Sequence, residues 1–205
     1  MPEESEPLYP PPHHQSIDKE KMIAVLKQYP FATLVSAAGG TPFITHIPII
    51  YNEDSAKLVA HIDKFNPQLK TLVNGAEVTV IFKGPDTYIS PSVYTTKQLP
   101  TWNYIIVHIK GTIRLINDPS DAKDTMIAMT AFLEGDNPKF VLEKENTAMQ
   151  RSINYIQAFD ITITSWEGKF KLSQDKNTQD QENAKQALIK KSDEDITGFI
   201  ERMYD

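Results

Sequence analysis

The chain has 205 residues, a length that suits one domain or one domain with appendages. It is 40% hydrophobic and 23% charged, as soluble globular proteins are, and no stretch reaches the ~20 consecutive apolar residues of a membrane-spanning helix. The absence of cysteine excludes disulfides, thiolate metal sites and a cysteine nucleophile, and the net charge of −6 with dispersed basic residues argues against direct binding of nucleic acid.

Residues 1–15 predict an irregular leader. Their start, MPEESEPLYPPPHH, is acidic and rich in proline and lacks the basic and apolar blocks of a secretory signal, so we expect a cytoplasmic protein without membrane attachment. Helical spacing begins at Asp18, and Pro30 ends it. The apolar face of this predicted helix consists of Met22, Val25, Leu26 and Tyr29.

Six stretches predict β-strands, at residues 31–36, 43–51, 57–62, 77–83, 104–116 and 158–166. Gly39 and Gly40 predict a turn after the first strand. We expect the second strand to be buried on both sides, and Pro48, which cannot donate to a ladder, to mark an edge or a bulge. A bulge or sharp coil is expected at Gly111 of the longest strand, and turns are expected over residues 84–94.

The stretches between and after these strands predict helices. Asn66 and Pro67 are typical of the cap and first-turn proline of a short helix, and Gly75 fits its far end. Further helical stretches are predicted at residues 118–135, 140–151 and 181–204, the last divided into two helices by a cap at Ser192.

The connections between strands decide the fold class. Most are turns rather than crossover helices, which argues against a doubly wound parallel sheet. We therefore expect a mainly β protein with peripheral helices (α+β), built around a small antiparallel barrel of about six strands.

Familiar catalytic motifs are missing from the sequence. There is no HExxH, GxSxG or SxxK in its required context, no GxGxxG and no P-loop pattern. His46, His61 and His108 lie on separate predicted strands and could converge on a metal, but no carboxylate stands beside them in a metal-motif spacing. We expect no metal site, and each histidine to hydrogen-bond to backbone or ligand.

Polar and aromatic residues gather at the ends of the predicted strands. The clusters are THIP (45–48), HIDKFNP (61–67), GPDTYISPSVY (84–94), PTWNY (100–104) and GKFKLSQ (168–174). This mixture suits a ligand with a flat ring and an anionic tail, and Lys64 and Asn66 precede a predicted helix start where a phosphate would fit. The alternative for Trp102 and Tyr104 is that they are core residues with a satisfied polar tip.

Taken in this order, the five clusters and the LYPPPHH start resemble the PaiB-like family of FMN-binding split-barrel proteins, from about residue 8 to residue 174. The resemblance implies a six-stranded antiparallel split β-barrel that forms a homodimer, with FMN in a cleft shared by both subunits. It also brings the label of a negative transcriptional regulator. The barrel domain would span residues 1–175, including the leader, and a helical extension would span residues 176–205.

The resemblance also implies locations for site residues. Thr45, His46 and Pro48 would line the flavin side of one strand, and His61, Lys64 and Asn66 would lie near the ribityl phosphate. Trp102 and Asn103 would form part of the pocket or the dimer wall, with PTWNY as a fixed corner before the longest strand; Lys171, Ser173 and Gln174 would contribute from the exit of the last strand.

Two departures from the family pattern bear on the cofactor. Asp63-Lys64 stands where the family has Ala-Arg, and Asp175-Lys176 stands where it has Asn-Arg. Each departure adds an acid and replaces the bidentate fork of arginine by lysine, so we expect weakened FMN binding or a different bound anion.

Three functions remain open from the sequence. The first is an FMN-dependent redox or flavin reductase-like protein, which would be an oxidoreductase if it is an enzyme; no catalytic residue is identified. The second is a transcriptional regulatory protein that acts without a recognisable DNA-binding motif. The third is a split barrel that has lost FMN and binds another small ligand.

Overall fold

The computed structural model describes residues 10–192. These residues form two compact units. The first unit takes residues 10–17, 84–106 and 168–192, and the second takes residues 18–83 and 107–167. The second helix predicted for the tail lies outside the described residues. No helix within them is long and apolar enough to cross a membrane.

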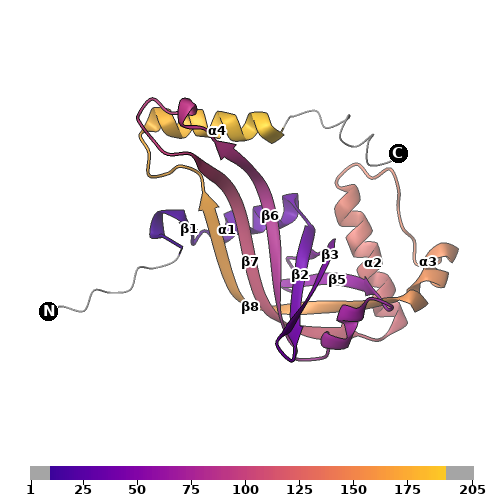
Figure 1. Cartoon of the computed structure of the whole chain (residues 1–205). Coiled ribbons are helices and arrows are strands. Elements are labelled where there is room, and N and C mark those ends of the chain that lie inside the picture. Colours follow the sequence, from indigo (N-terminus) through magenta and orange to yellow (C-terminus); the bar gives the residue numbers. More distant parts are fainter. Residues whose placement is uncertain (1–9, 193–205) are drawn as a thin grey trace, which may run out of the picture. The chain divides into compact units, whose positions relative to one another are not determined.

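Eight strands form a mainly antiparallel sheet within the described residues (Figure 1). Their hydrogen-bonded order is β3-β2-β6-β7-β8-β5-β4, and β1 pairs with β8. The strands are β1 (Gln15–Ser16), β2 (Phe31–Ala38), β3 (Thr41–Pro48), β4 (Ile50–Asn52), β5 (Lys57–Asp63), β6 (Glu77–Ile89), β7 (Thr101–Ile116) and β8 (Ile156–Lys171). The predicted fold class is confirmed, with two more strands than predicted.

The two extra strands have different causes, one local and one distant in sequence. The predicted strand 43–51 is divided because Pro48 cannot donate a hydrogen bond and the N–H of Ile49 turns to the carbonyl of Pro30, 2.8 Å away. At the end of the predicted leader, Gln15 and the next residue, Ser16, pair with Lys169 and Gly168 to form β1.

Helices begin where the sequence offers caps. Asp18 and Asp118 accept backbone N–H groups at the starts of α1 (Lys19–Gln28) and α2 (Pro119–Glu134), and Gly135 ends α2 with a φ of 71°. The other helices are α3 (Thr147–Ser152), α4 (Thr178–Ser192) and the 3-10 helices η1 (Pro12–His14), η2 (Pro67–Thr71), η3 (Pro91–Val93) and η4 (Ile153–Tyr155).

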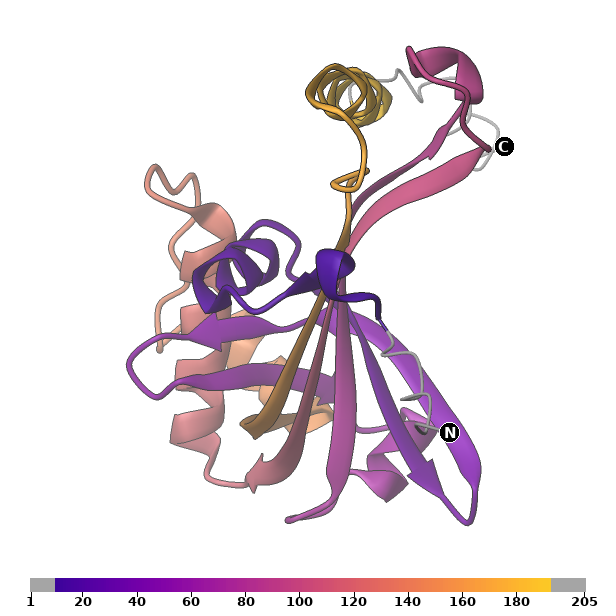
Figure 2. The ribbon, with the colours of Figure 1, turned by 90° about the vertical axis from the view of Figure 1, so that its left-hand side faces the viewer.

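The second unit contains an apolar core between its strands and α1. Of the predicted apolar face of α1, Met22, Val25 and Leu26 are buried, whereas Tyr29 follows the helix as its C-cap and is 36% exposed. Fully buried core residues are Leu26, Leu34, Ile49, Leu58, Ala60, Leu72, Val80, Phe82, Val107, Ile109, Phe159 and Ile161. Figure 2 shows β2 and β3 side by side as a hairpin, which turns at Gly39 and Gly40 as predicted.

Several predictions about the strands were wrong. β3 is not buried on both sides, since Ile44 is 58% exposed. The prediction for Pro48 holds, because β3 lies at one end of the strand order and Pro48 is its last residue. Residues 84–89 continue β6 instead of turning, and β7 already begins at Thr101, so most of PTWNY is strand.

Two predictions about helices were also wrong in extent. The short helix after Asn66 is a 3-10 helix that ends at Thr71, and Leu72 rather than Gly75 caps it. Of the stretch 140–151, only the residues from Thr147 onward form α3. Their N-cap, Asn146, accepts the N–H groups of Ala148 and Met149.

Candidate functional site

The site residues expected from the sequence fall into two groups, one in each unit. The second unit contains Thr45, His46, Pro48, His61, Lys64 and Asn66; the first contains Trp102, Asn103, Lys171, Ser173 and Gln174.

In the second unit, most of these polar side chains are bonded to their own scaffold. Asn66 donates from Nδ2 to Thr45 Oγ1 at 3.0 Å and accepts the N–H of Gln68 at 2.9 Å, so it fastens η2 to β3. His46 Nδ1 lies 2.9 Å from Thr33 Oγ1 on the paired strand. The helix start at which we expected a phosphate therefore belongs to a five-residue 3-10 helix whose first N–H is already bonded to Asn66.

His61 lies on β5 opposite Ala158 of β8. Burial lowers its pKa from the ordinary value of 6.5, so the imidazole is neutral at pH 7. Its Nδ1 is buried without a hydrogen-bond partner in the structure. Lys64, three residues later, is exposed, and its N–H bonds to the carbonyl of Tyr155.

The first unit contains a pocket of about 330 Å³. One wall is the segment 98–101, which leads into β7. The other wall is the segment 171–176, which begins with the last residue of β8, and His14 of η1 also lines the pocket. The lining residues are His14, Gln98, Leu99, Pro100, Thr101, Asn103, Lys171, Ser173, Asp175 and Lys176. Three of the expected site residues, Asn103, Lys171 and Ser173, thus come together.

Trp102 and Gln174 do not line this pocket. The indole N–H of Trp102 donates to Asp86 Oδ1 at 2.8 Å, and its ring lies 6.3 Å from that of Tyr88. Gln174 closes its own loop, because its Oε1 accepts the N–H of Leu172 at 2.7 Å and its Nε2 donates to the carbonyl of Phe170.

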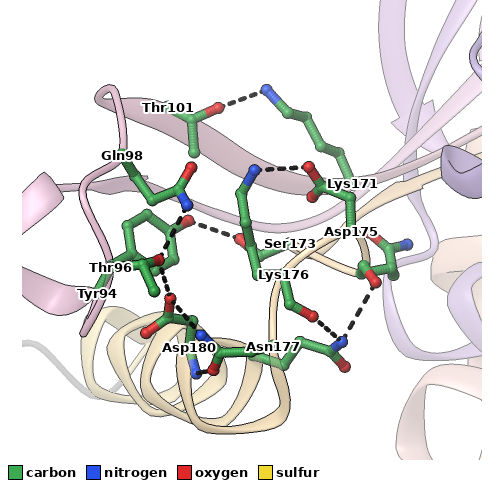
Figure 3. A network of polar contacts seen from close by, with 12 residues as sticks. Tyr94, Thr96, Gln98, Thr101, Lys171, Ser173, Asp175, Lys176, Asn177 and Asp180 are labelled. Atoms are coloured by element: carbon green, nitrogen blue, oxygen red, sulfur yellow. Dashed lines mark hydrogen bonds and ion pairs between the residues drawn. The ribbon is translucent and has the colours of Figure 1, made fainter.

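A buried polar network includes two of the lining residues, Asn103 and Ser173. The hydroxyl of Ser173 lies 2.8 Å from that of Tyr94 and accepts from Asn103 Nδ2 at 3.0 Å; the first contact is drawn in Figure 3. Ser173 has a φ of 63°, a left-handed conformation that is uncommon for a residue with a side chain. The network therefore holds Ser173 in place, between the pocket-lining residues Lys171 and Asp175.

Charges of both signs line the pocket. Lys171 Nζ donates to Thr101 Oγ1 at 2.5 Å, and Lys176 Nζ donates to Asp175 Oδ2 at 2.6 Å (Figure 3). That hydrogen bond is the largest of the effects that lower the pKa of Asp175. The pKa of His14 is lowered by burial first and then by the adjacent His13 and by Lys171, so the ring is neutral at pH 7. Among the residues that line the pocket, two ammonium groups against one carboxylate give a net positive charge.

Sequence reasoning missed several members of this site. Gln98 and His14 were not expected in it, and neither was Asp180, which accepts three hydrogen bonds from Thr95 and Thr96 beside the pocket. The only local signal was the spacing Asn177 to Asp180, a pair that can cap the start of a helix.

Comparison with known proteins places the chain in a family. Residues 8–165 match the model of the family described as "Putative FMN-binding domain". The chain belongs to this family. A relative in it, the Protease synthase and sporulation protein PAI 2 of Bacillus subtilis, is 27% identical over 201 residues, which cover 97% of each chain. The resemblance to the PaiB-like family is thereby confirmed.

A further relative and two solved structures of similar fold extend the comparison. An uncharacterized protein of Emericella nidulans is 27% identical over 222 aligned positions, covering 82% of this chain and 86% of its own. The FAD and heme binding protein from Mycobacterium smegmatis superposes with a TM-score of 0.64 at 20% identity, over 83% of this chain and 80% of that one. The flavocytochrome Anf3 from Azotobacter vinelandii superposes with a TM-score of 0.58 at 18% identity, over 77% of this chain and 69% of that one. The two structural comparisons show that this chain shares its fold with these solved proteins.

Proposed function

We propose that the protein binds FMN and that the pocket of the first unit takes the phosphate-bearing end of the cofactor. The observation that carries this proposal is the donor set of the pocket, in which the ammonium groups of Lys171 and Lys176 lie with the hydroxyl of Thr101. An ammonium group has three N–H donors, and the bond from Lys171 to Thr101 uses one of them. Membership of the FMN-binding domain family supports the same ligand.

The residues fit the cofactor by their chemistry. A phosphate monoester needs cations and N–H or O–H donors, and ribityl hydroxyls need groups that both donate and accept, which Gln98 and Thr101 supply. The volume of about 330 Å³ lies at the lower end of the range for small-molecule sites. A whole flavin therefore needs further surface, which we propose a second subunit supplies in a homodimer.

FMN supplies redox chemistry when it is bound, while the protein binds and orients it. The pocket does not pair a general acid with a general base, so we assign no catalytic residue. We propose an FMN-dependent oxidoreductase or flavin reductase-like activity, and we keep the substrate open. Lys171 and Lys176 would neutralise the phosphate, and Thr101 and Gln98 would orient the sugar alcohol.

Asp175 and Asp63 bear on affinity in different ways. Asp175 lines the pocket and accepts a hydrogen bond from the ammonium group of Lys176. We propose that this negative charge weakens binding of an anionic ligand. Asp63 accepts the N–H of Phe65 at 2.7 Å and stabilises its own turn. We therefore attribute the larger part of any weakening to Asp175.

A regulatory role is the second candidate, because the Bacillus subtilis relative is named for protease synthesis and sporulation. The net charge of −6 favours regulation through a protein partner or a small molecule over direct DNA binding. A gel shift at physiological salt that shows specific DNA binding would contradict this preference. A split barrel that has exchanged FMN for another anion is the third candidate.

The first experiment is a visible absorption spectrum of the purified protein, before and after addition of FMN and desalting. We expect a retained flavin spectrum, tighter binding of FMN than of riboflavin, and weakened FMN binding in Lys171→Gln. Lys139→Gln, an exposed lysine of the second unit, is the matched control. Sedimentation analysis then tests the homodimer. A colourless protein that ignores added FMN would overturn the proposal.

A further inference from the structure

Both walls of the pocket are attached to the first two turns of α4. The wall 98–101 is attached through the segment just before it, and the wall 171–176 is attached directly by a side chain of the helix. The two attachments start from neighbouring residues, Asp180 and Gln181. The helix therefore joins two segments that are about 70 residues apart in the chain, as the contact between Lys171 and Thr101 also does.

The attachment of the first wall depends on Asp180. This carboxylate is fully buried; Oδ1 accepts the N–H of Thr95 at 2.5 Å and its hydroxyl at 2.7 Å, and Oδ2 accepts the hydroxyl of Thr96 at 2.6 Å. The hydroxyl of Thr96 in turn accepts from Gln98 Nε2 at 3.0 Å, and Gln98 lines the pocket (Figure 3). Burial by itself would raise the pKa of Asp180, but the bonds donated by Thr96 and Thr95 outweigh it and lower the pKa to about 2.

The attachment of the second wall depends on Gln181. Its Nε2 donates to the carbonyl of Lys176 at 2.7 Å and to that of Gln174 at 3.2 Å. The N–H of Lys176 bonds to the carbonyl of Ser173 at 3.0 Å, so the bonds from Gln181 hold a turn that is closed by its own hydrogen bond. Asn177 caps the helix from the same turn, because its Oδ1 accepts the N–H of Asp180 at 2.8 Å.

The rest of α4 is docked by apolar packing within the same unit. Ala184 is fully buried against Ile89 and Tyr94, and Asn183 Nδ2 donates to the carbonyl of Val93 at 2.9 Å. Tyr94 is also the residue whose hydroxyl contacts Ser173, which lines the pocket. Tyr94 thus takes part both in docking the helix and in positioning Ser173 of the pocket.

We propose that α4 is a latch for the ligand pocket, with Asp180 as the positioning residue that couples helix docking to ligand binding. This inference rests on the proposed function, because the ligand is taken to be FMN. A ligand that contacts both walls favours the docked helix, and by thermodynamic reciprocity the docked helix favours the ligand by the same factor. Release of the latch would open the pocket and let the ligand exchange.

The test compares Asp180→Asn with Glu182→Gln in the full chain. Glu182→Gln removes the same charge from the same helix, but the carboxylate of Glu182 accepts its bonds from Lys185 and Gln186 on the exposed side. Gln181→Ala is a milder variant that releases the second wall alone. Hydrogen exchange is measured over residues 94–101, 171–176 and 178–192 without ligand and with FMN, and the FMN dissociation constant is measured by flavin fluorescence.

We expect faster exchange of both walls in Asp180→Asn without ligand, an FMN affinity weakened about fivefold or more, and slower exchange of α4 in the wild type when FMN is bound. Glu182→Gln should match the wild type in all three. Unchanged wall exchange and unchanged FMN affinity in Asp180→Asn and Gln181→Ala would overturn the latch while FMN binding stands. A wild type that binds no FMN overturns the proposed function, and the exchange of the two walls without ligand then decides whether Asp180 holds them.

Discussion

The hydroxyl of Tyr94 lies 2.8 Å from the hydroxyl of Ser173, and this contact joins the connection between β6 and β7 to the loop after β8. Ser173 also exchanges hydrogen bonds with Asn103, which is 1% exposed. Ser173 therefore pairs, in the interior of the first unit, with two polar side chains that lie 79 and 70 residues earlier in the chain. Removing one member of such a network lowers the free energy of unfolding, because the remaining polar groups are left buried without a partner.

Substitutions in this network should separate the loss of one bond from the loss of the whole network. Tyr94→Phe removes a single hydroxyl, and we expect it to lower the free energy of unfolding by roughly 0.5–1.5 kcal/mol. Ser173→Ala leaves both Tyr94 and Asn103 unpaired, and we expect a loss of about 1–3 kcal/mol. Urea unfolding followed by circular dichroism measures both. Equal effects of the two substitutions would show that Ser173 does not link the network.

Stability at low pH should depend on Asp180. Its pKa is about 2 in the folded protein and near 3.8 in an unfolded chain, so the unfolded state binds a proton first as the pH falls. The contribution of Asp180 is therefore complete above about pH 5 and is lost progressively as the pH falls through 3.8 toward 2. We expect the unfolding free energy of the wild type to fall more steeply between pH 5 and pH 2, given as rough limits, than that of Asp180→Asn. Parallel curves for the two proteins would contradict this assignment.

Gly111 is predicted to tolerate no side chain. A Cβ at this position of β7 would lie 2.5 Å from Cγ2 of Ile161 and 2.6 Å from the carbonyl oxygen of Thr162. We expect Gly111→Ala to destabilise the protein by about 1–3 kcal/mol, since backbone of the neighbouring strand must move. Gly84→Ala is the matched control, because its Cβ would lie 3.2 Å from Cβ of Ile105 and 3.4 Å from the carbonyl oxygen of Ile105, both longer contacts than those at Gly111, so its effect should be smaller. Thermal unfolding of the two variants compares them directly.

Removal of the carboxylate at Asp175 should strengthen binding of an anionic ligand. The change Asp175→Asn releases Lys176 from its ion pair and raises the positive charge of the pocket. Because the pair is partly solvated, we expect a modest gain in FMN affinity of about two- to fivefold. Asp54→Asn, in an exposed turn of the second unit, changes the net charge equally and should have no effect. The gain should disappear for riboflavin, which lacks the phosphate, and fluorescence titration measures both ligands.

The sequence predicted the elements whose signals are local. Caps and stops such as Asp18, Asp118 and Gly135 act on neighbouring N–H and C=O groups, so the helices that they bound were predicted correctly. Strand ends were less predictable, because a strand exists only where a distant segment pairs with it. The Gln15–Ser16 strand is of this kind, since its partner residues lie at 168 and 169.

The same distinction applies to the site. Clusters at strand ends and the family resemblance brought Asn103, Lys171 and Ser173 into one expected site, and these residues line one pocket. His14 and Gln98 carried no signal of their own, because a single polar residue in a proline-rich or polar stretch has many possible environments. The prediction for Trp102 and Gln174 as cofactor contacts stays a prediction, and both side chains bond within the first unit.

By itself, the sequence determined the fold class, the antiparallel strands, the capped helices and the family, because periodicity, caps and motif order are properties of the chain. Only the tertiary structure decided which charges meet. Asp175 faces Lys176 inside the pocket, and Asp180 lies buried beneath Thr95 and Thr96. Burial and pairing of a carboxylate depend on chain segments that fold against it from far away, and these fix both its charge state and its effect on a bound ligand.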